Sequence, residues 1–216
     1  MSVAFRQAVA ADLSFIIEGI VSSEKSGTET LAYCKIFDIS ESEFTTLLTH
    51  ILEEEIEGQE WFIPSFCIAE LDGFPVACLS AWVEGRAGSP SGILKAQAMS
   101  YFLGDRWVSA QANLHEVASI QILRITGALQ LENIYTASIH RGKGIAGKLI
   151  EYAIKHNLET MPEIPLAEIQ LMGNNENALQ SYTKCGFLKH AVSAISNDNI
   201  LHLLPGNFRV SLTRTL

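Results

Sequence analysis

The sequence predicts one mixed α/β domain spanning residues 1–216, and three observations lead to this fold class. Hydrophobic residues make up 48% and charged residues 18%, which is enough for a packed core and too little charge for general disorder. Strand-like and helix-like apolar patterns alternate along the chain without a repeat. A strand, a glycine-rich loop, a helix and a second strand occupy residues 129–172, which favours a parallel strand pair joined by a right-handed crossover.

The N-terminal elements follow from periodicity and caps. Residues 3–6 predict a short strand, and the helical spacing of the apolar residues after Asp12 predicts a helix that Asp12 caps. A second helix is expected to begin at a Ser40 or Ser42 cap and to end before Gly58.

A hairpin and an insertion come next. Two apolar runs, 66–71 and 75–83, are joined by Asp72 and Gly73, which is a strong hairpin signal. Glycines then break the pattern, so we expect residues 84–126 to form an insertion with one or two helices.

The C-terminal elements are expected in the order strand, helix, strand, helix and strand. They are predicted at residues 129–138, 144–156, 166–172, 177–184 and 208–212.

The composition excludes several function classes. A net charge of −9 argues against a nucleic-acid surface, and the longest apolar run, near residues 74–82, is shorter than a membrane span. The first 30 residues lack a signal-peptide pattern, and the four cysteines form no C-x-x-C pair or other metal-ligand spacing. We therefore expect a cytoplasmic protein with reduced thiols, no metal, no membrane partner and no nucleic-acid partner.

The acidic charge is concentrated in one segment. No lysine or arginine lies between Lys35 and Arg86, so this segment carries −11 and the rest of the chain +2. Two interpretations stay open: a solvated helix face, or an acidic rim that concentrates a cationic substrate.

The strongest chemical signal is the loop after the fourth predicted strand. It consists of Arg141, Gly142, Lys143, Gly144, Ile145, Ala146, Gly147 and Lys148. A helix N-terminus presents unpaired N–H groups, and glycines let an anion approach the backbone, so this loop can hold a phosphate.

Two other interpretations of the loop remain. It could be a plain tight turn, or Gly142, Gly144 and Gly147 could form a dinucleotide fingerprint with Glu163 or Glu168 as the ribose ligand. A Walker A loop is excluded because no G-K-[ST] ends the run.

Three sequence patterns together resemble the GCN5-related N-acetyltransferase (GNAT) family. The family's acetyl-CoA motif is matched by Arg141, Gly144 and Ala146, and its fourth-strand run by residues 131–135. Its second signature, N-x-x-A-x-x-x-Y-x-x-x-G-F, is matched by Asn175, Ala178, Tyr182, Gly186 and Phe187. Thr136 and Ser138 depart from the family's usual Val and Pro without putting cofactor binding in doubt.

The resemblance implies a fold and an activity. The fold would be a mixed, mostly antiparallel sheet with strands four and five parallel, helices on both faces, and the helical insertion between strands three and four. The activity would be transfer of acetyl from acetyl-CoA to a primary amine by direct attack. A non-catalytic acyl-CoA-binding module and a nicotinamide-dependent oxidoreductase remain as alternatives.

The resemblance also assigns residues to the cofactor. Besides residues 141–148, the implied acetyl-CoA contacts are Ile134, Tyr135, Thr136, Asn175, Ala178 and Tyr182. The backbone N–H of Ile134 would donate to the thioester oxygen, and Thr136 would help to pair the pantetheine amides.

Tyr182 and Glu132 are the catalytic candidates. The resemblance makes Tyr182 the acid that protonates the departing thiolate, although a packed aromatic is the alternative. Glu132 is a candidate base because an amine with a pKa near 10.4 must lose a proton before it attacks, and a water chain could serve instead. His115 and Glu116 are weaker candidates for the base, and Cys185 is expected to be a core residue.

The acceptor amine is not specified by any motif. If the acidic segment faces the strands, a polyamine or an aminoglycoside-like amine is favoured. If it faces solvent, a protein amino terminus or an amino acid fits as well. The insertion is expected to cover the acceptor side, and both a monomer and a homodimer stay open.

Overall fold

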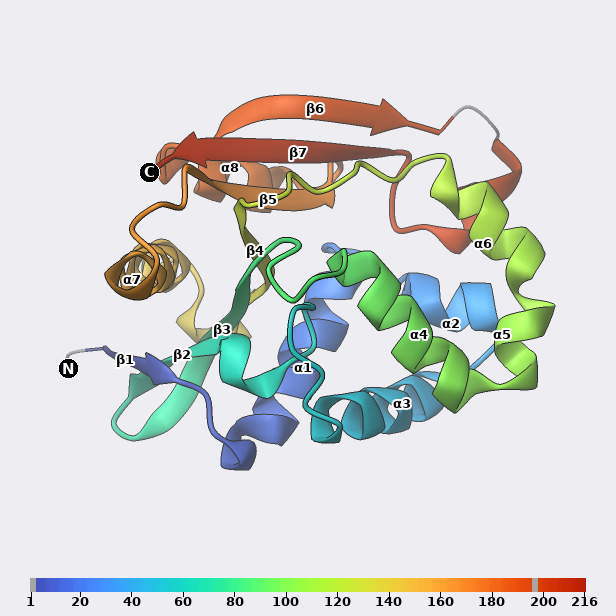
Figure 1. Ribbon diagram of the computed structural model, residues 1–216, viewed down its shortest axis with the longest axis horizontal. Coiled ribbons are helices and arrows are strands. Elements are labelled where there is room, and N and C mark those ends of the chain that lie inside the picture. The colour runs from blue at the N-terminus through green and yellow to red at the C-terminus, as the bar shows by residue number, and fades with distance from the viewer. Residues whose placement is uncertain (1–2, 196–197) are drawn as a thin grey trace.

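A computed structural model describes residues 3–195 and 198–216, and its strands form one mixed sheet (Figure 1). The strand order is β1-β2-β3-β4-β5-β7-β6. The bounds are β1 (Ala4–Gln7), β2 (Phe66–Leu71), β3 (Phe74–Val83), β4 (Leu129–Thr136), β5 (Leu166–Met172), β6 (Leu188–Ala194) and β7 (Phe208–Thr215). β4 and β5 are parallel, whereas the other neighbours are antiparallel. The predicted fold class is confirmed.

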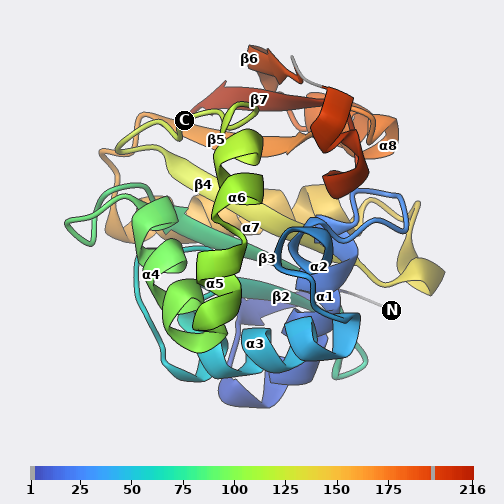
Figure 2. The same ribbon diagram turned by 90° about the vertical axis from the view of Figure 1, so that its right-hand side faces the viewer.

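Helices cover both faces of this sheet (Figures 1 and 2). They are α1 (Leu13–Glu24), α2 (Ala32–Phe37), α3 (Glu41–Glu53), α4 (Ser91–Leu103), α5 (Asp105–Ser109), α6 (Gln111–Ala118), α7 (Ile145–Thr160) and α8 (Glu176–Lys184). The helix α1 packs on β3 and β4 from one face, and α7 packs on β2, β3 and β4 from the other. None of the helices in the described part of the chain is long and apolar enough to cross a membrane.

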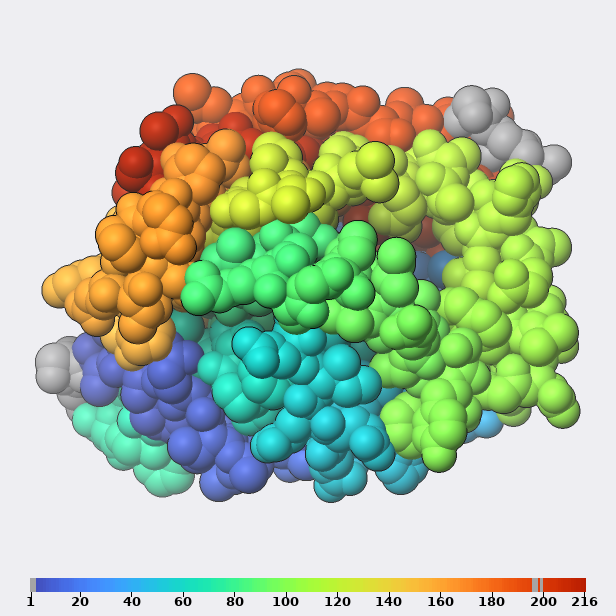
Figure 3. All heavy atoms as spheres, viewed as in Figure 1, coloured from blue at the N-terminus to red at the C-terminus, as the bar shows by residue number. Residues whose placement is uncertain are grey.

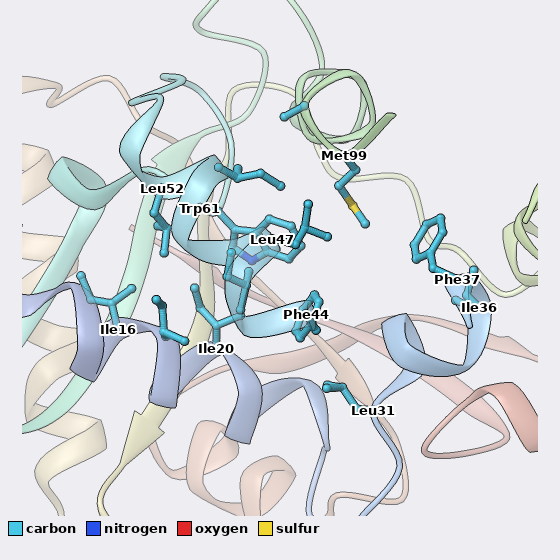
Figure 4. Close-up of a cluster of buried hydrophobic side chains, with 14 of the residues drawn as sticks. Ile16, Ile20, Leu31, Ile36, Phe37, Phe44, Leu47, Leu52, Trp61 and Met99 are labelled. Carbon is cyan, nitrogen blue, oxygen red and sulfur yellow. The ribbon is translucent and has the colours of Figure 1, made fainter. Parts of the chain in front are cut away.

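Each face has its own hydrophobic core. On the α1 face, Phe44 and Trp61 are fully buried between α1, α3 and α4 (Figure 4). On the α7 face, Leu149, Ile150 and Phe187 are fully buried. Because side chains alternate along a strand, neighbouring residues of β4 serve opposite cores. Two layers of helices therefore sandwich a sheet that is buried on both sides over its centre.

Local signals explain the hairpin and the second predicted helix. Asp72 and Gly73 both have positive φ, 54° and 82°, as a two-residue type I′ turn requires. Ser40, rather than Ser42, caps α3: its side chain accepts a hydrogen bond from the Glu43 N–H, and the Glu43 carboxylate accepts one from the Ser40 N–H.

Three expectations about local structure need correction. The carboxylate of Asp12 makes no cap on α1; it accepts hydrogen bonds from Arg6 at 2.6 and 2.8 Å and from the Val9 N–H at 2.9 Å. Residues 84–126 contain α4, α5 and α6 rather than one or two helices. The helix α2 and the strand β6 were not predicted at all.

Two buried carboxylates hold the ends of the 84–126 segment. Glu84 accepts hydrogen bonds from the Ser91 N–H and hydroxyl, at 2.9 and 2.6 Å, where α4 begins. Glu168 on β5 accepts from the Ile125 N–H at 2.8 Å, just before β4. Because both carboxylates are buried, these bonds fix the segment over the α1 face as a wall rather than a loose loop.

The sheet opens between β4 and β5. The parallel ladder pairs only Leu129 with Ala167 and Gln130 with Glu168. Further along β4, Asn133 has a φ of 53° and the register with β3 shifts, which is a β-bulge. The two strands therefore separate from Leu131 onward, and this separation positions the site.

Candidate active site

A cavity of about 200 Å³ occupies the space where β4 and β5 separate. Its walls come from both faces of the sheet: α1 and the 84–126 segment on one side, α8 on the other. Figure 3 shows a hollow in this region, with blue and red segments visible between the green and yellow-green parts of the insertion. The cavity therefore passes through the sheet and joins its two faces.

Strand alternation places Glu132 on the α1 face of this cavity. Leu129 and Leu131 pack into the α7 core, whereas Gln130 donates to Glu168 on the opposite face. Glu132 follows Gln130 by two residues before the bulge, so it shares that face. Its carboxylate lies 3.5 Å from Arg124, and its side chain is 16% exposed.

Burial sets the ionisation of Glu132. Loss of solvation raises the pKa of its carboxyl to about 7, with Arg124 opposing the rise and Glu60 adding to it. A carboxylate with this pKa can hold and release a proton near neutral pH, which is what a general base needs.

Tyr182 reaches the same cavity from α8, on the other face. Its side chain is 8% exposed. Burial, followed by the charge of Glu132, raises the pKa of its phenol above the ordinary value of 10. The hydroxyl therefore stays protonated at neutral pH and can donate a proton.

An ion-pair network lies in the wall of the cavity on the α1 face. Glu60 binds Arg124 at 2.6 Å and also pairs with Lys95. Lys95 donates to the hydroxyl of Tyr33 at 2.9 Å, and its ammonium lies 5.0 Å from the ring of Trp61. Although burial opposes ionisation, the two cations lower the pKa of Glu60 to about 2. Together with Glu132, these charges compensate one another.

The glycine-rich loop leads from β4 into α7 on the opposite side of the cavity. Gly142 and Gly144 have φ values of 75° and 71°, and a Cβ at either position would meet nothing within 4 Å. Within the described residues, the N–H groups of residues 142–147 have no hydrogen-bond acceptor. Free amides at the N-terminus of a 16-residue helix form an anion site, so the loop fits a diphosphate.

The basic side chains of the loop differ in whether a hydrogen bond holds them. Arg141 donates to the Thr136 carbonyl at 3.0 Å, and Lys143 donates to the Ile139 carbonyl at 3.1 Å. Lys148 is exposed on the first turn of α7. These three cations surround the free amides and oppose the negative charge of the whole chain.

Several residues expected at the cofactor can reach it only through backbone atoms. The Ile145 side chain is buried in the α7 core, and the Tyr135 hydroxyl donates to Glu18 on α1. A Cβ at Gly147 would lie 3.2 Å from the sulfur of Cys185, so this glycine also allows α7 to approach α8. Ala146 is half-buried beside it.

The second signature of the sequence lines the cavity. Ile134, Ala178 and Tyr182 contribute to its wall, and Thr136 follows two residues after Ile134 with a buried hydroxyl that has no partner in the described part of the chain. Asn175 also lines the cavity and caps α8, because its side chain accepts from the Ala178 N–H at 3.3 Å. The spacing of this signature therefore reflects a capped helix that carries Tyr182 into the cavity.

Other candidates lie elsewhere. His115 and Glu116 are exposed on α6 and do not line the cavity. Cys185 packs against Gly147, and burial raises the pKa of its thiol, which does not favour a nucleophile.

The dinucleotide interpretation does not fit this structure. Glu168 is fully buried and saturated by protein donors, and Glu163 is exposed and lies 3.8 Å from Arg86. In addition, a dinucleotide fold needs a mostly parallel sheet, whereas only β4 and β5 are parallel among the described strands.

The acidic segment mostly faces solvent. Of its carboxylates, only Glu60 lines the cavity, and it is neutralised by Lys95 and Arg124. Glu84 is buried at the start of α4. The interpretation as a solvated helix face therefore fits the exposed carboxylates of α3, such as Glu53.

Sequence reasoning missed most of the charged wall. The missed residues are Glu24, Glu60, Lys95, Arg124 and Arg209. They come from α1, the loop before β2, the insertion and β7, so no local spacing links them.

One family model matches part of the chain. Residues 104–189, which include β4, the glycine-rich loop, α7, β5 and α8, match the model of the acetyltransferase (GNAT) domain. This part of the chain is therefore similar to the GNAT acetyltransferase domain. The resemblance stated from the sequence motifs is thereby confirmed, and GNAT proteins generally use acetyl-CoA as the acetyl donor. No curated protein sequence matches the chain.

Solved structures of N-acetyltransferases have the same fold as this chain. An agmatine N-acetyltransferase is 12% identical with a TM-score of 0.60, and 100% of each chain is covered. An N-acetyltransferase from Staphylococcus aureus is 15% identical with a TM-score of 0.59, covering 98% of this chain and 100% of the other. A ribosomal-protein-alanine N-acetyltransferase from Brucella melitensis is 16% identical with a TM-score of 0.54, covering 99% of each chain. At these identities the similarity establishes the fold alone.

Proposed function

We propose that residues 1–216 form a single acetyl-CoA-dependent N-acetyltransferase domain, with 84–126 as its insertion, that transfers acetyl to a primary amine by direct attack. The observation that carries this proposal is the cavity through the sheet, which Glu132 lines from one face and Tyr182 from the other. A donor held on the α7 side and an acceptor held under the insertion would meet between these two side chains.

The loop residues would hold the donor. The free amides of residues 142–147 and the cations of Arg141, Lys143 and Lys148 match the charge and hydrogen-bonding needs of a diphosphate. Acetyl-CoA supplies the acetyl group as a thioester. Backbone groups of Ile134, Tyr135 and Thr136 lie on the separated part of β4, where an extended amide-containing arm can pair with a strand edge.

Glu132 would take the proton from the acceptor amine. Its raised pKa keeps the carboxylate largely ionised just above neutral pH while leaving it basic enough to accept a proton. Arg124, 3.5 Å away, would steady the charged form without neutralising it, because Arg124 binds Glu60 more closely at 2.6 Å.

Tyr182 and Ile134 would act on the thioester of the acetyl donor. The protonated phenol of Tyr182 would give its proton to the departing thiolate, whose pKa is about 8.5 by analogy with cysteine. The backbone N–H of Ile134, next to the bulge at Asn133, would donate to the oxygen that gains negative charge.

Ligand binding followed by turnover tests this function. Thermal shifts with acetyl-CoA, CoA and NAD are measured first, and release of the CoA thiol is then followed with a panel of amines. The proposal expects stabilisation by acetyl-CoA and CoA and amine-dependent thiol release. Stabilisation by acetyl-CoA without release under any condition would favour a binding module, and stabilisation by NAD alone would favour an oxidoreductase.

A further inference from the structure

Two charged side chains that line the cavity make no hydrogen bond or contact ion pair within the described part of the chain, although the charge of Arg209 acts on Glu24. Glu24, the last residue of α1, and Arg209, near the start of β7, form no hydrogen bond or ion pair through their side chains with any described residue. The Nε of Arg209 is buried and unsatisfied. A guanidinium N–H that is buried without an acceptor is costly unless something binds it.

Arg209 lies on the acceptor side of the sheet. It pairs in register with Met172, and Ser211, two residues along β7, bonds Glu168 on the α1 face. Strand alternation puts the side chain of Arg209 on that same face, under the insertion. Arg209 is also near enough to Glu132 to lower the pKa of that carboxyl against the larger effect of burial.

The charges of the cavity wall are balanced, not acidic. Three carboxylates, those of Glu24, Glu60 and Glu132, and three cations, those of Lys95, Arg124 and Arg209, line it among the described residues. Glu60 and Glu132 together balance Lys95 and Arg124. Among these described residues, Arg209 and Glu24 are the remaining cation and anion of the wall; each feels the other's charge, but they make no contact ion pair. A polycation would leave the Nε of Arg209 without an acceptor, whereas an amine that also carries an anion would supply one.

We infer that the acceptor is an amine that carries a carboxylate, of free amino-acid size, and that Arg209 binds its carboxylate. This inference rests on the proposed function and specifies the acceptor of the same site. A guanidinium binds a carboxylate through two parallel hydrogen bonds, which fixes orientation as well as position. With the carboxylate on Arg209, the amine of the acceptor lies toward Glu132, and Glu24 supplies the negative charge that attracts the ammonium before it is deprotonated.

Matched acceptors and matched variants test this inference. Thiol release from acetyl-CoA is measured with free amino acids, with their carboxamides and with the corresponding decarboxylated amines. We expect kcat/KM for at least one amino acid to exceed that for its carboxamide by about 10- to 100-fold. The preference is measured as the ratio of kcat/KM for the amino acid to kcat/KM for its carboxamide: in Arg209→Gln that ratio falls to about 1, and in Arg209→Lys it is partly kept.

Arg214→Gln is the control on the same strand, since Arg214 binds Glu151 on the outer surface and does not line the cavity. It should leave the preference intact. If the wild-type protein uses carboxamides or decarboxylated amines as well as amino acids, or if Arg209→Gln keeps the preference, the inference is wrong while the acetyltransferase proposal stands. Absence of transfer to every amine would overturn the proposed function, and the inference with it.

Discussion

Glu132 on β4 and Tyr182 on α8 line one cavity from opposite faces of the sheet, and the charge of Glu132 is one cause of the raised pKa of the Tyr182 phenol. Burial raises the pKa of both groups, yet the two groups differ in protonation state. At slightly alkaline pH the carboxylate is largely ionised and the phenol is protonated. A group that can accept a proton and a group that can donate one thus lie across a space open to both sides of the sheet, which supports the proposed acyl transfer to an amine.

Replacing Tyr182 by Phe should lower kcat by about 100-fold while the Kd for acetyl-CoA changes by less than about threefold, because only the proton donor is removed. Stopped-flow thiol release gives kcat, and calorimetry gives the Kd. Tyr152→Phe is the control: Tyr152 lies on α7, stacked on Phe5 at 5.6 Å, and should leave both quantities unchanged. If Tyr182→Phe lowered turnover and acetyl-CoA binding equally, the result would show that Tyr182 only packs and donates no proton.

The pH profile should report the ionisation of Glu132. A general base works only when deprotonated, so kcat/KM for the acceptor is expected to rise with pH and to level off above about 7. Glu132→Gln should lower kcat/KM by about 100-fold and remove this acidic limb. Thermal unfolding at pH 8 checks that the variant is folded. A limb that persists in Glu132→Gln at full activity would assign the base to a water chain or another group.

Charge at the glycine-rich loop should control donor binding. Gly144→Asp places a carboxylate in the open space near the free amides, and repulsion from a diphosphate should weaken acetyl-CoA binding by about 10- to 100-fold. Gly144→Asn is a close control because asparagine has the same size as aspartate and adopts the left-handed φ of 71° about as readily as aspartate does. Calorimetry on both variants separates charge from strain: equal affinities would show that the diphosphate lies elsewhere.

The elements that sequence reasoning located are those with strong local signals. The Asp72 and Gly73 turn, the Ser40 capping box and the glycine-rich loop each specify a backbone conformation within a few residues. The family's second signature placed Tyr182 on the expected helix because Asn175 caps that helix.

The elements that were missed lack such signals. The strand β6 is largely exposed, with polar residues such as Lys189 and His190, so its alternation is weak. The helix α2 has only six residues, Ala32–Phe37, fewer than periodicity can identify. The charged cavity wall could not be predicted because long-range packing alone brings Lys95 and Arg209 to the same place.

The buried carboxylate of Glu168 should be a stability determinant rather than a ligand. It accepts hydrogen bonds from the Ile125 N–H at 2.8 Å, from Gln130 at 2.9 Å and from the Ser211 hydroxyl at 2.6 Å, so it ties the end of the insertion to β4 and β7. Glu168→Ala would leave these donors buried and unpaired, at a cost of about 3 kcal/mol or more. Urea unfolding should show this loss as a lower midpoint, and Tm should fall by about 6–12 °C.

The control variant is Glu163→Gln. It removes an exposed carboxylate 3.8 Å from Arg86 and should change the free energy of unfolding by less than about 1 kcal/mol. Equal stability of the two variants would mean that the insertion is not held through Glu168.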